Sequence, residues 1–510
     1  MNNIEQLKQL IKKFDIISFD IFGTLLENPL KNDKSTYKYI SEIISDINFF
    51  DQRIESQKKE RISKLIRNKN FEEIKLSDIY QRMMKKYHHV QEIEKELLFS
   101  ILYPNQLVIE LFNYAKKLNK TIIITSDTFY DKNFICKLLS KNSINGYKRL
   151  FLSCDYGKTK ASGNLFKLVI DELHTDANKI IHFGDNKISD IERANTNGIY
   201  AVYIDTNNFN NLFLKYAPLK LPKAGNSDNY WYQLGYCIGG YLALSFVQNV
   251  IKISEEKNIN KILFVARDGY ILKKIFDLIN SNKELVGIYV YASRHLKTLY
   301  GDCFDKNKAQ YESYISDLKI KNTDKLCIVD TATANYSAES LLKKYISNSN
   351  IIGIYLTSTK KDINHINLTT IDKPYTKFNW DFIELLIASI EFPIVEIKDS
   401  MPVYETTNLI EQNRKIIYEE ILKGEIDFVK DYLELFKKFK ICLSIDSAII
   451  SIIEFWNNLT TIDKSFFHQI KHAIDPENKI YFDILSSKEE KVKMFIKKDI
   501  SIIRKKLLRQ

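Results

Sequence analysis

A short apolar run that ends in an acid, close to the start of the chain, constrains the fold most strongly. The run FDIISF (14–19) is mostly apolar and follows a charged segment, which predicts a buried strand of a parallel sheet. Asp20 comes directly after it, and Gly23 and Thr24 follow in the next turn. Open α/β sheets bind ligands beyond the carboxyl ends of their strands, so a ligand site is expected at Asp20. An Asp before Gly and Thr also ends many ordinary strands as a turn or helix cap.

Three later segments supply further polar side chains. The β-branched run KTIIITSD (120–127) ends in a hydroxyl and an acid, GKTKASG (157–163) offers two lysines, and KIIHFGDNKISD (179–190) predicts another buried strand followed by two acids. In chain order these groups are Ser126 and Asp127, then Lys158 and Lys160, then Asp185 and Asp190. The acids and hydroxyls follow apolar strands, so the segments are expected to meet at one edge of a sheet.

This ordered set resembles the haloacid dehalogenase (HAD) superfamily, which has an Asp nucleophile, a Ser or Thr, a Lys, and a Gly-Asp pair with a second Asp. The resemblance implies an α/β fold with a Rossmann-like core and a helical cap. It also implies that Asp20, Ser126 and Lys160 are catalytic, since the family's spacing favours Lys160 over Lys158. The phosphate-binding group it implies consists of Gly23, Thr24, Ser126, Asp127 and Lys160.

The resemblance further implies a Mg²⁺ site. Its ligands are Asp20, the backbone carbonyl of Phe22 and Asp185, with Asp190 in the inner or outer shell. Hard oxygen ligands together with water suit Mg²⁺. A carboxylate can attack a phosphate ester in line and form an aspartyl-phosphate. We therefore expect metal-dependent phosphoryl chemistry at this site.

Phe22 departs from the pattern of most phosphatases in the superfamily. They carry a second Asp at this position, two residues after the nucleophile, as general acid and base. General acid-base help contributes about 10² to 10⁴ in rate, so either another group supplies it or turnover is slow. Dehalogenases of the superfamily also have an aromatic residue here and need no metal. The presence of Asp185 and Asp190 favours the phosphatase over that alternative.

The motif SFDIFGTLL (18–26) more closely resembles a branch of the superfamily found in bacterial surface-polysaccharide gene clusters. That branch usually has Asp where this chain has Gly23. The resemblance implies a small phosphorylated sugar or polyol as substrate, in capsule or lipopolysaccharide biosynthesis. The alternative, supported by Phe22 and Gly23, is a catalytically weak binding or scaffold protein that serves a glycosyltransferase or another enzyme of the pathway.

The anchors divide the chain into three regions. Residues 1–217 are expected to form the hydrolase domain, with a charged, helix-patterned insertion at about 27–104 as the cap; an ordinary helical packing layer is the plainer alternative. A linker with two prolines and a glycine precedes a second α/β domain of three layers, expected at 228–403. Residues 404–510 show a helical pattern without recognisable chemistry.

Two predicted strands of the second domain end in polar clusters. Arg267 and Asp268 follow one strand, and Asp330 ends another. Such clusters at strand ends could bind a phosphate or a sugar. Equally, Arg267 and Asp268 could only close a turn and pair with neighbours.

Composition narrows the class of protein. With 45% hydrophobic residues the chain can bury substantial cores, and its net charge of +11 is spread along 510 residues. No basic patch interleaved with aromatic residues indicates nucleic-acid binding. The six cysteines form no metal-type pairs, which suits a reducing cytosol. No apolar run reaches roughly 18 residues, so we expect a cytoplasmic protein without a transmembrane segment.

Overall fold

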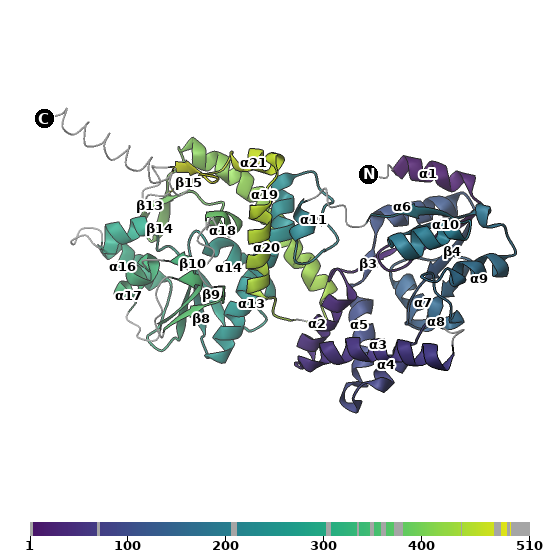
Figure 1. The fold of residues 1–510 in the computed structure, drawn as a ribbon. Helices are drawn as coiled ribbons and strands as arrows, with labels where there is room; N and C mark the ends of the chain where they lie inside the picture. Colours follow the sequence, from purple (N-terminus) through teal and green to yellow (C-terminus); the bar gives the residue numbers. More distant parts are fainter. Residues whose placement is uncertain are drawn as a thin grey trace. The chain divides into compact units, whose positions relative to one another are not determined.

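The computed structural model describes residues 4–68, 72–205, 212–301, 308–333, 336–346, 351–358, 364–371, 381–439, 441–473, 481–486 and 490 (Figure 1). The chain divides into two compact units. The first comprises Met1–Asn211, Leu219–Pro222 and Asp431–Ile441, and the second comprises Leu212–Pro218, Lys223–Lys430 and Cys442–Gln510. Each unit contains a parallel sheet with helices, which confirms the predicted α/β class.

The first unit is built on a five-stranded parallel sheet in the order β5-β4-β1-β6-β7. These strands are β5 (Arg149–Leu152), β4 (Thr121–Ser126), β1 (Ile16–Phe19), β6 (Ile180–Gly184) and β7 (Tyr200–Tyr203). β1 is central and fully buried, as its apolar sequence predicts. It pairs with β4 on one side and β6 on the other, so the carboxyl ends of these three strands lie together.

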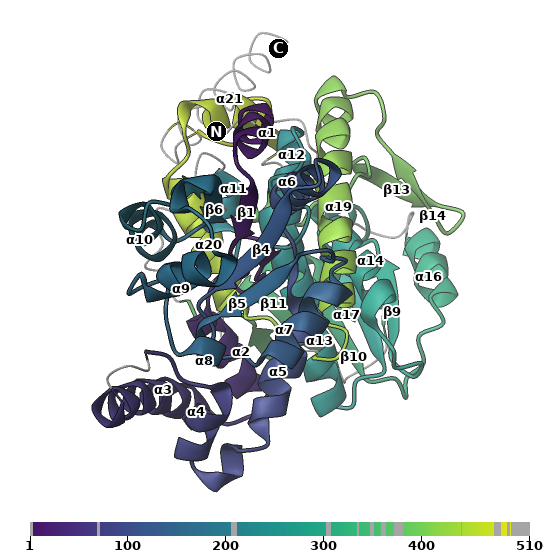
Figure 2. The same cartoon turned by 90° about the vertical axis from the view of Figure 1, so that its right-hand side faces the viewer.

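Helices cover both faces of this sheet (Figure 2). On one face, Leu165 and Phe166 of α9 (Asn164–Leu173) and Ala194 of α10 (Arg193–Thr196) share a buried cluster with Ile16. On the other face, Phe112 of α6 (Gln106–Lys117) contacts Phe19, with ring centroids 5.6 Å apart. The alternation of β1 side chains between the two faces produces the expected three-layer, Rossmann-like arrangement.

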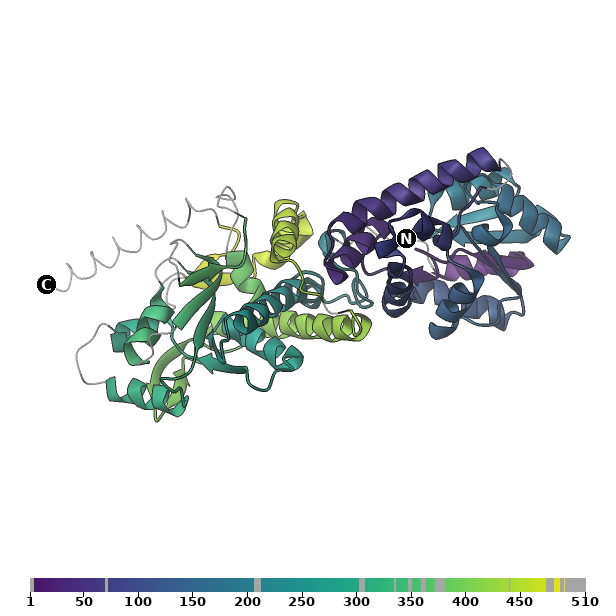
Figure 3. The same ribbon diagram turned by 90° about the horizontal axis from the view of Figure 1, so that it is seen from below.

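A helical insertion follows β1 in the first unit. Its ends form a two-stranded stem in which β2 (Leu26–Glu27) pairs antiparallel with β3 (Tyr103–Pro104). Between them lie α2 (Asp33–Ile43), α3 (Asn48–Arg67), α4 (Leu76–Arg82), η1 (Lys85–Tyr87) and α5 (Val90–Ile101), drawn in purple and dark blue in Figure 3. We call this helical insertion the cap.

The cap contains a buried ion pair that ties its helices together. Arg53 of α3 and Glu94 of α5 are both fully buried, and two guanidinium nitrogens donate to the carboxylate at 2.9 Å. The hydroxyl of Tyr80 also donates to Glu94, at 2.6 Å, and that of Tyr130, which follows β4, donates at 2.7 Å. Burial alone would raise the pKa of Glu94, but Arg53 and these hydrogen bonds hold it below its usual range.

The second unit has its own five-stranded parallel sheet, in the order β12-β11-β10-β8-β9. The strands are β8 (Lys261–Val265), β9 (Val286–Val290), β10 (Leu326–Thr333), β11 (Ile351–Ser358) and β12 (His365–Asn367). The chain passes from β8 to β9 on one side and then returns to β10 on the other side of β8. The topological switch point of this sheet therefore lies between β8 and β10.

Further helices and short strands complete the two units. In the first unit they are α1 (Ile4–Lys13), α7 (Lys132–Lys141), α8 (Ser153–Tyr156), η2 (Ala177–Lys179) and η3 (Lys187–Glu192). In the second unit they are α11 (Leu212–Tyr216), α12 (Tyr230–Leu234), η4 (Gly235–Gly239), α13 (Gly240–Glu256), α14 (Gly269–Ile279), α15 (Arg294–Leu296), η5 (Lys297–Gly301), α16 (Lys308–Asp317), α17 (Ser337–Tyr345), α18 (Asp381–Leu386), β13 (Ile394–Lys398), β14 (Met401–Tyr404), α20 (Ile445–Asn457), α21 (Thr461–Phe467), β15 (Lys471–Ala473) and β16 (Tyr481–Asp483).

The segment from 404 onward is mostly helical where it is described. Its longest helix is α19 (Leu409–Leu435), and the two short strands β15 and β16 pair antiparallel near its end. Residues 491–510, also predicted to be helical, lie outside the described residues.

One continuous helix, Tyr230–Glu256, is long and apolar enough to cross a membrane by length and composition alone. The prediction that no segment meets this test was wrong, because the glycines at 235, 239 and 240 do not interrupt the helix. They are sites of close packing: a side chain on Gly235 would meet the backbone of Ile421 at 2.0 Å. Of the most apolar window, 83% is buried within the protein, which favours a core helix over a membrane span.

Candidate active site

The carboxyl ends of β1, β4 and β6 bring the predicted site residues of the first unit together. Asp20 follows β1, and its backbone N–H donates to the carbonyl of Phe183 in β6 at 2.9 Å. Ser126 ends β4, and Asp185 follows β6 directly. This placement follows from the parallel pairing, which aligns the ends of adjacent strands.

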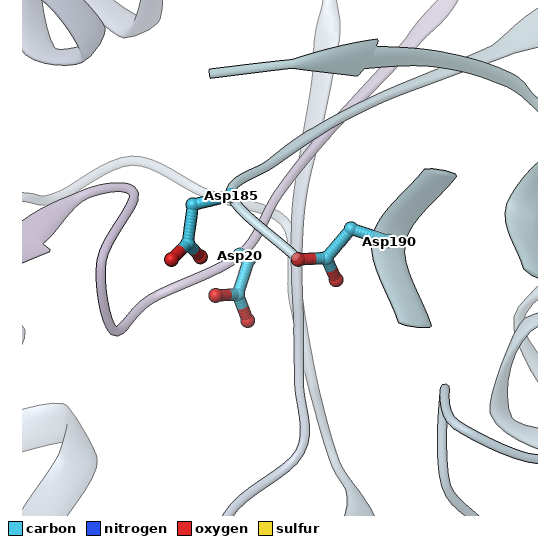
Figure 4. Close-up of side chains that lie close together, drawn as sticks. All are labelled: Asp20, Asp185 and Asp190. Carbon is cyan, nitrogen blue, oxygen red and sulfur yellow. The ribbon is translucent and has the colours of Figure 1, made fainter. Parts of the chain in front are cut away.

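Three carboxylates gather at this edge. Asp20, Asp185 and Asp190 each offer an oxygen atom, and these atoms lie within 4.8 Å of one another. Figure 4 shows the three side chains converging, with Asp190 reaching in from η3. Asp20 and Asp190 are buried, at 5% and 1% exposure, whereas Asp185 is partly open. Such a group of hard oxygen ligands fits a Mg²⁺ ion.

Lys160 joins two of these acids. Its ammonium donates to Asp20 at 2.6 Å and to Asp190 at 2.5 Å, and its side chain is only 3% exposed. The resemblance favoured Lys160 over Lys158 for this position, and the ammonium of Lys160 lies against the carboxylate of Asp20. A lysine here can neutralise an anion bound at Asp20.

The acids affect one another's protonation. Burial raises the pKa of Asp20 to about 7, with Asp190 and Asp185 adding to the rise and Lys160 opposing it. Burial, followed by the charge of Asp190, raises the pKa of Asp185 to about 6. Burial would also raise the pKa of Asp190, but Lys160 and His182 hold it below the usual range. The lowered pKa favours the ionised form of Asp190, which pairs with Lys160.

His182 of β6 belongs to this network, although the sequence analysis did not select it. It is fully buried, its Nδ1 lies 2.8 Å from the Ser18 hydroxyl, and its Nε2 lies 3.3 Å from Asp190. Ser18 in turn donates to the Thr125 hydroxyl at 3.1 Å. Burial lowers the pKa of His182, which keeps its ring neutral. The available signal was a histidine at an inward position of an otherwise apolar strand.

Ser126 and Asp127 play different parts in the structure. The Ser126 hydroxyl is buried and has no hydrogen-bond partner among the described residues. Asp127 accepts backbone N–H bonds from Lys160 at 2.7 Å and Ala161 at 3.1 Å, so it fixes the loop that carries the lysine. An unpaired buried hydroxyl costs about 1–3 kcal/mol, a cost that a bound ligand oxygen removes.

Gly23 and Thr24 use their donors within the protein. The Gly23 N–H donates to the Leu26 carbonyl at 2.8 Å, and the Thr24 hydroxyl donates to Asp185 at 3.3 Å. Gly23 has φ +77°, and a Cβ on it would lie 2.3 Å from an oxygen of Asp185. The absence of a side chain at Gly23 is therefore what makes room for Asp185.

A cleft within the first unit has a volume of about 940 Å³, and Asp127 and Asp185 are among the residues that line it. Phe22 lies in its wall, half-buried, with its ring 6.0 Å from that of Tyr130. The cap and the 219–222 segment contribute polar lining residues, among them Lys31, Gln57, Arg61, Glu73 and Lys220. A cleft of this size can hold a drug-sized or sugar-sized molecule.

The predicted second-domain residues lie in the second unit, apart from this network. Arg267 and Asp268 follow β8, as expected. Asp330 does not end its strand, because β10, the neighbour of β8, continues to Thr333. Arg267 is paired with Glu411 of α19 at 3.1 Å.

Comparison with solved structures gives weak matches to the first part of the chain. An L-2-haloacid dehalogenase from Xanthobacter autotrophicus is 10% identical, with 38% of this chain and 77% of that chain covered and a TM-score of 0.29. A HAD phosphatase from Thermococcus onnurineus is 19% identical, with 38% and 87% covered and a TM-score of 0.28. With TM-scores this low, the similarities establish neither a shared fold nor a shared activity. No protein-family model and no curated protein sequence matches the chain.

Proposed function

We propose that the first unit is a hydrolase of the HAD type: a Mg²⁺-dependent phosphohydrolase that acts through an aspartyl-phosphate on Asp20. The observation that carries the proposal is the meeting of Asp20, Lys160 and the acids Asp185 and Asp190 at one strand edge. The unpartnered Ser126 hydroxyl at the end of the adjacent strand supports it, because such a group suits a ligand oxygen.

The residues present fit a divalent cation. Asp20 and Asp185 would hold the ion with the Phe22 carbonyl, while Asp190 is engaged with Lys160, His182 and the Asn186 N–H at 2.9 Å. When bound, Mg²⁺ supplies positive charge that offsets the charge of the phosphoryl oxygens. The three clustered carboxylates, with one ammonium between them, leave a net negative site that a cation completes.

Asp20, Lys160 and Ser126 can together displace the leaving group of a phosphate ester. A carboxylate oxygen of Asp20 forms a bond to phosphorus as the bond from phosphorus to the leaving oxygen breaks. Lys160 and Ser126 bind the phosphoryl oxygens during this step. Water then attacks the phosphorus of the aspartyl-phosphate, which restores the Asp20 carboxylate and releases phosphate.

Most phosphatases of the superfamily have a proton donor for the leaving group at the position of Phe22, and the Phe22 side chain cannot donate a proton. Its ring packs towards Tyr130 rather than offering an acid. We therefore propose that esters with good leaving groups react faster than alkyl esters, which leave poorly without a proton.

The proposed substrate is a small phosphorylated sugar or polyol. The polar lining of the cleft, with amide, ammonium and carboxylate groups, suits a ligand that carries several hydroxyls. The proposed setting in capsule or lipopolysaccharide biosynthesis, and a glycosyltransferase as partner, rest on the resemblance of the first motif alone.

A screen of phosphate release from aryl and alkyl phosphate esters, with Mg²⁺ and with excess chelator, tests the proposal. We expect turnover that needs Mg²⁺, is lost in Asp20→Asn, and persists in the control Asp171→Asn, which changes an exposed acid. Phe22→Asp should raise the alkyl rate selectively, with Phe22→Leu as the control for lost packing.

Several outcomes would contradict this function. Full activity in excess chelator would favour metal-free displacement, as in dehalogenases. Wild-type turnover of an alkyl phosphate at about 10 per second or more would show that another proton donor exists. No turnover on any ester, together with phosphate binding, would favour the catalytically weak binding protein.

A further inference from the structure

The second unit has a cluster of charged side chains at the switch point of its own sheet. Asp268 stands at the N-cap of α14, three residues after β8 ends, and Asp330 lies within the adjacent β10, three residues before that strand ends. Glu384 of α18 and Arg294 of α15 interact electrostatically with both acids. Parallel strands that diverge at a switch point leave a crevice between their carboxyl ends, where α/β proteins bind ligands.

A buried hydroxyl points to a ligand at this switch point. Thr331, the residue after Asp330, is fully buried, and its Oγ1 has no hydrogen-bond partner among the described residues. A hydrogen-bond contact from Thr331 lowers the pKa of Asp268, so the hydroxyl faces this acid, but the contact falls outside normal hydrogen-bond geometry. Buried polar groups are nearly always satisfied, so an unsatisfied hydroxyl facing an acid indicates a missing partner.

Positive groups border the same place. Arg267 is held by Glu411, a fully buried acid that also binds Arg414 at 2.6 Å and the Tyr481 hydroxyl at 3.0 Å. The side chain of Arg267 is still 31% exposed. Arg294 is exposed and forms no ion pair with any described residue. Both guanidinium groups act to lower the pKa of Asp268, the N-cap of α14, so they lie near this helix N-terminus, and such a combination suits a phosphate.

The acids of this cluster suit the hydroxyl groups of a ligand better than they suit a metal ion. Burial raises the pKa of Asp268, Asp330 and Glu384 to about 7 each, and the neighbouring acids add to the rise. Sugar hydroxyls can donate to such carboxylates without adding charge. Within the described ranges, the atoms of three potential metal ligands come within 4.8 Å of one another only in the first unit. The second cluster is therefore not preformed for a metal.

We propose that the switch point between β8 and β10 is a second ligand site, which binds a phosphorylated sugar. Arg294 and Arg267 with the α14 N-terminus receive the phosphate, and Asp268, Asp330 and the Thr331 hydroxyl receive the sugar hydroxyls. This site is separate in the chain from Asp20, and it does not depend on the activity proposed for the first unit.

Hydrogen exchange with mass spectrometry, on the full chain carrying Asp20→Asn so that ligand is not consumed, tests the proposal. The probes are glucose 1-phosphate, ribose 5-phosphate, glucose and inorganic phosphate. We expect a sugar phosphate to protect peptides that cover 264–272 and 326–331, more strongly than glucose or phosphate alone. Asp330→Asn and Arg294→Ala should each weaken this binding about tenfold or more.

Lys283→Ala is the matched control for Arg294→Ala. Lys283 is also exposed, but it precedes β9 and so lies at the amino ends of the strands, opposite the proposed site. It should bind as the parent does. Protection confined to peptides around residues 20 and 185 would overturn the second site while leaving the first intact. Protection of 264–272 and 326–331 by Mg²⁺ alone, or equal weakening by Lys283→Ala, would also overturn it.

Discussion

Gly23→Ala tests the idea that an absent side chain creates the position of Asp185. Gly23 has φ +77°, and the new Cβ would lie 2.3 Å from Oδ2 and 2.7 Å from the carboxyl carbon of Asp185. Contacts below 3.0 Å do not persist, so the carboxylate must move or the loop must shift. Gly198 provides a matched comparison: its φ is +78°, and its Cβ would meet only the side chain of Ala177, at 3.2 Å.

The magnitudes follow from these contacts. The left-handed backbone costs a non-glycine residue about 1 kcal/mol, and both variants incur this cost. Gly23→Ala also forces Asp185 away from the Thr24 hydroxyl, and the loss of that hydrogen bond costs about 1–1.5 kcal/mol more. We therefore expect losses of about 2–2.5 kcal/mol in the free energy of unfolding for Gly23→Ala and about 1 kcal/mol for Gly198→Ala.

Urea denaturation measures the loss of stability, and a Mg²⁺ titration measures the effect of displacing Asp185. In the titration, followed by thermal stability or by turnover, Gly23→Ala should bind the ion about 10–100-fold more weakly, and Gly198→Ala should bind it as wild type does. Equal Mg²⁺ affinity in the two variants would show that Asp185 does not depend on the empty space at Gly23. Equal losses of stability would show that only the backbone conformation matters.

Glu94→Gln should lower the free energy of unfolding by about 3–5 kcal/mol in urea, because it leaves Arg53 buried without its counter-charge, whereas the exposed Glu96→Gln should have little effect. In metal-free protein, the stability of Asp20→Asn relative to wild type should increase from pH 4 to 7. The pKa of Asp20 is raised to about 7, so wild type loses stability as pH rises through this range; a pH-independent difference would contradict this. Mg²⁺ should stabilise wild type more at pH 8 than at pH 5, where protonated Asp20 and Asp185 bind it poorly, as thermal melts can measure.

The sequence predicted the strand ends of the first unit well because the pattern is local. An apolar run indicates a buried strand, and the acid that follows it lies at the carboxyl end of that strand. Asp20 and Asp185 could therefore be placed at one sheet edge from the sequence. Lys160 could be selected only through the resemblance, because nothing in the segment itself distinguishes it from Lys158.

Long-range polar contacts could not be predicted in this way. Arg53 lies in a helix rich in charged residues, and nothing in that local pattern marks it as buried. It is fully buried because Glu94, forty-one residues later, compensates its charge. His182 was overlooked because a histidine at an inward position of an apolar strand indicates burial but does not identify its hydrogen-bond partners. The helix Tyr230–Glu256 was underestimated because its glycines, which usually interrupt helices, serve close packing instead.

The hydrogen bonds that join the cap to the core determine how rarely the cap opens. Besides the Tyr130–Glu94 bond, the Glu72 carboxylate accepts from the Thr159 N–H at 2.9 Å, and the Leu76 N–H donates to the Phe129 carbonyl at 2.8 Å. A hydrogen bond to a charged group is worth about 1.5–3 kcal/mol, so breaking only two of them would make a fully swung-out cap roughly a hundredfold or more rarer than the closed form. In the proposed phosphate-ester hydrolysis, phosphate and alcohol would then leave through the existing cleft. The time for which product stays bound would depend on side-chain motions at the rim of the cleft rather than on opening of the cap.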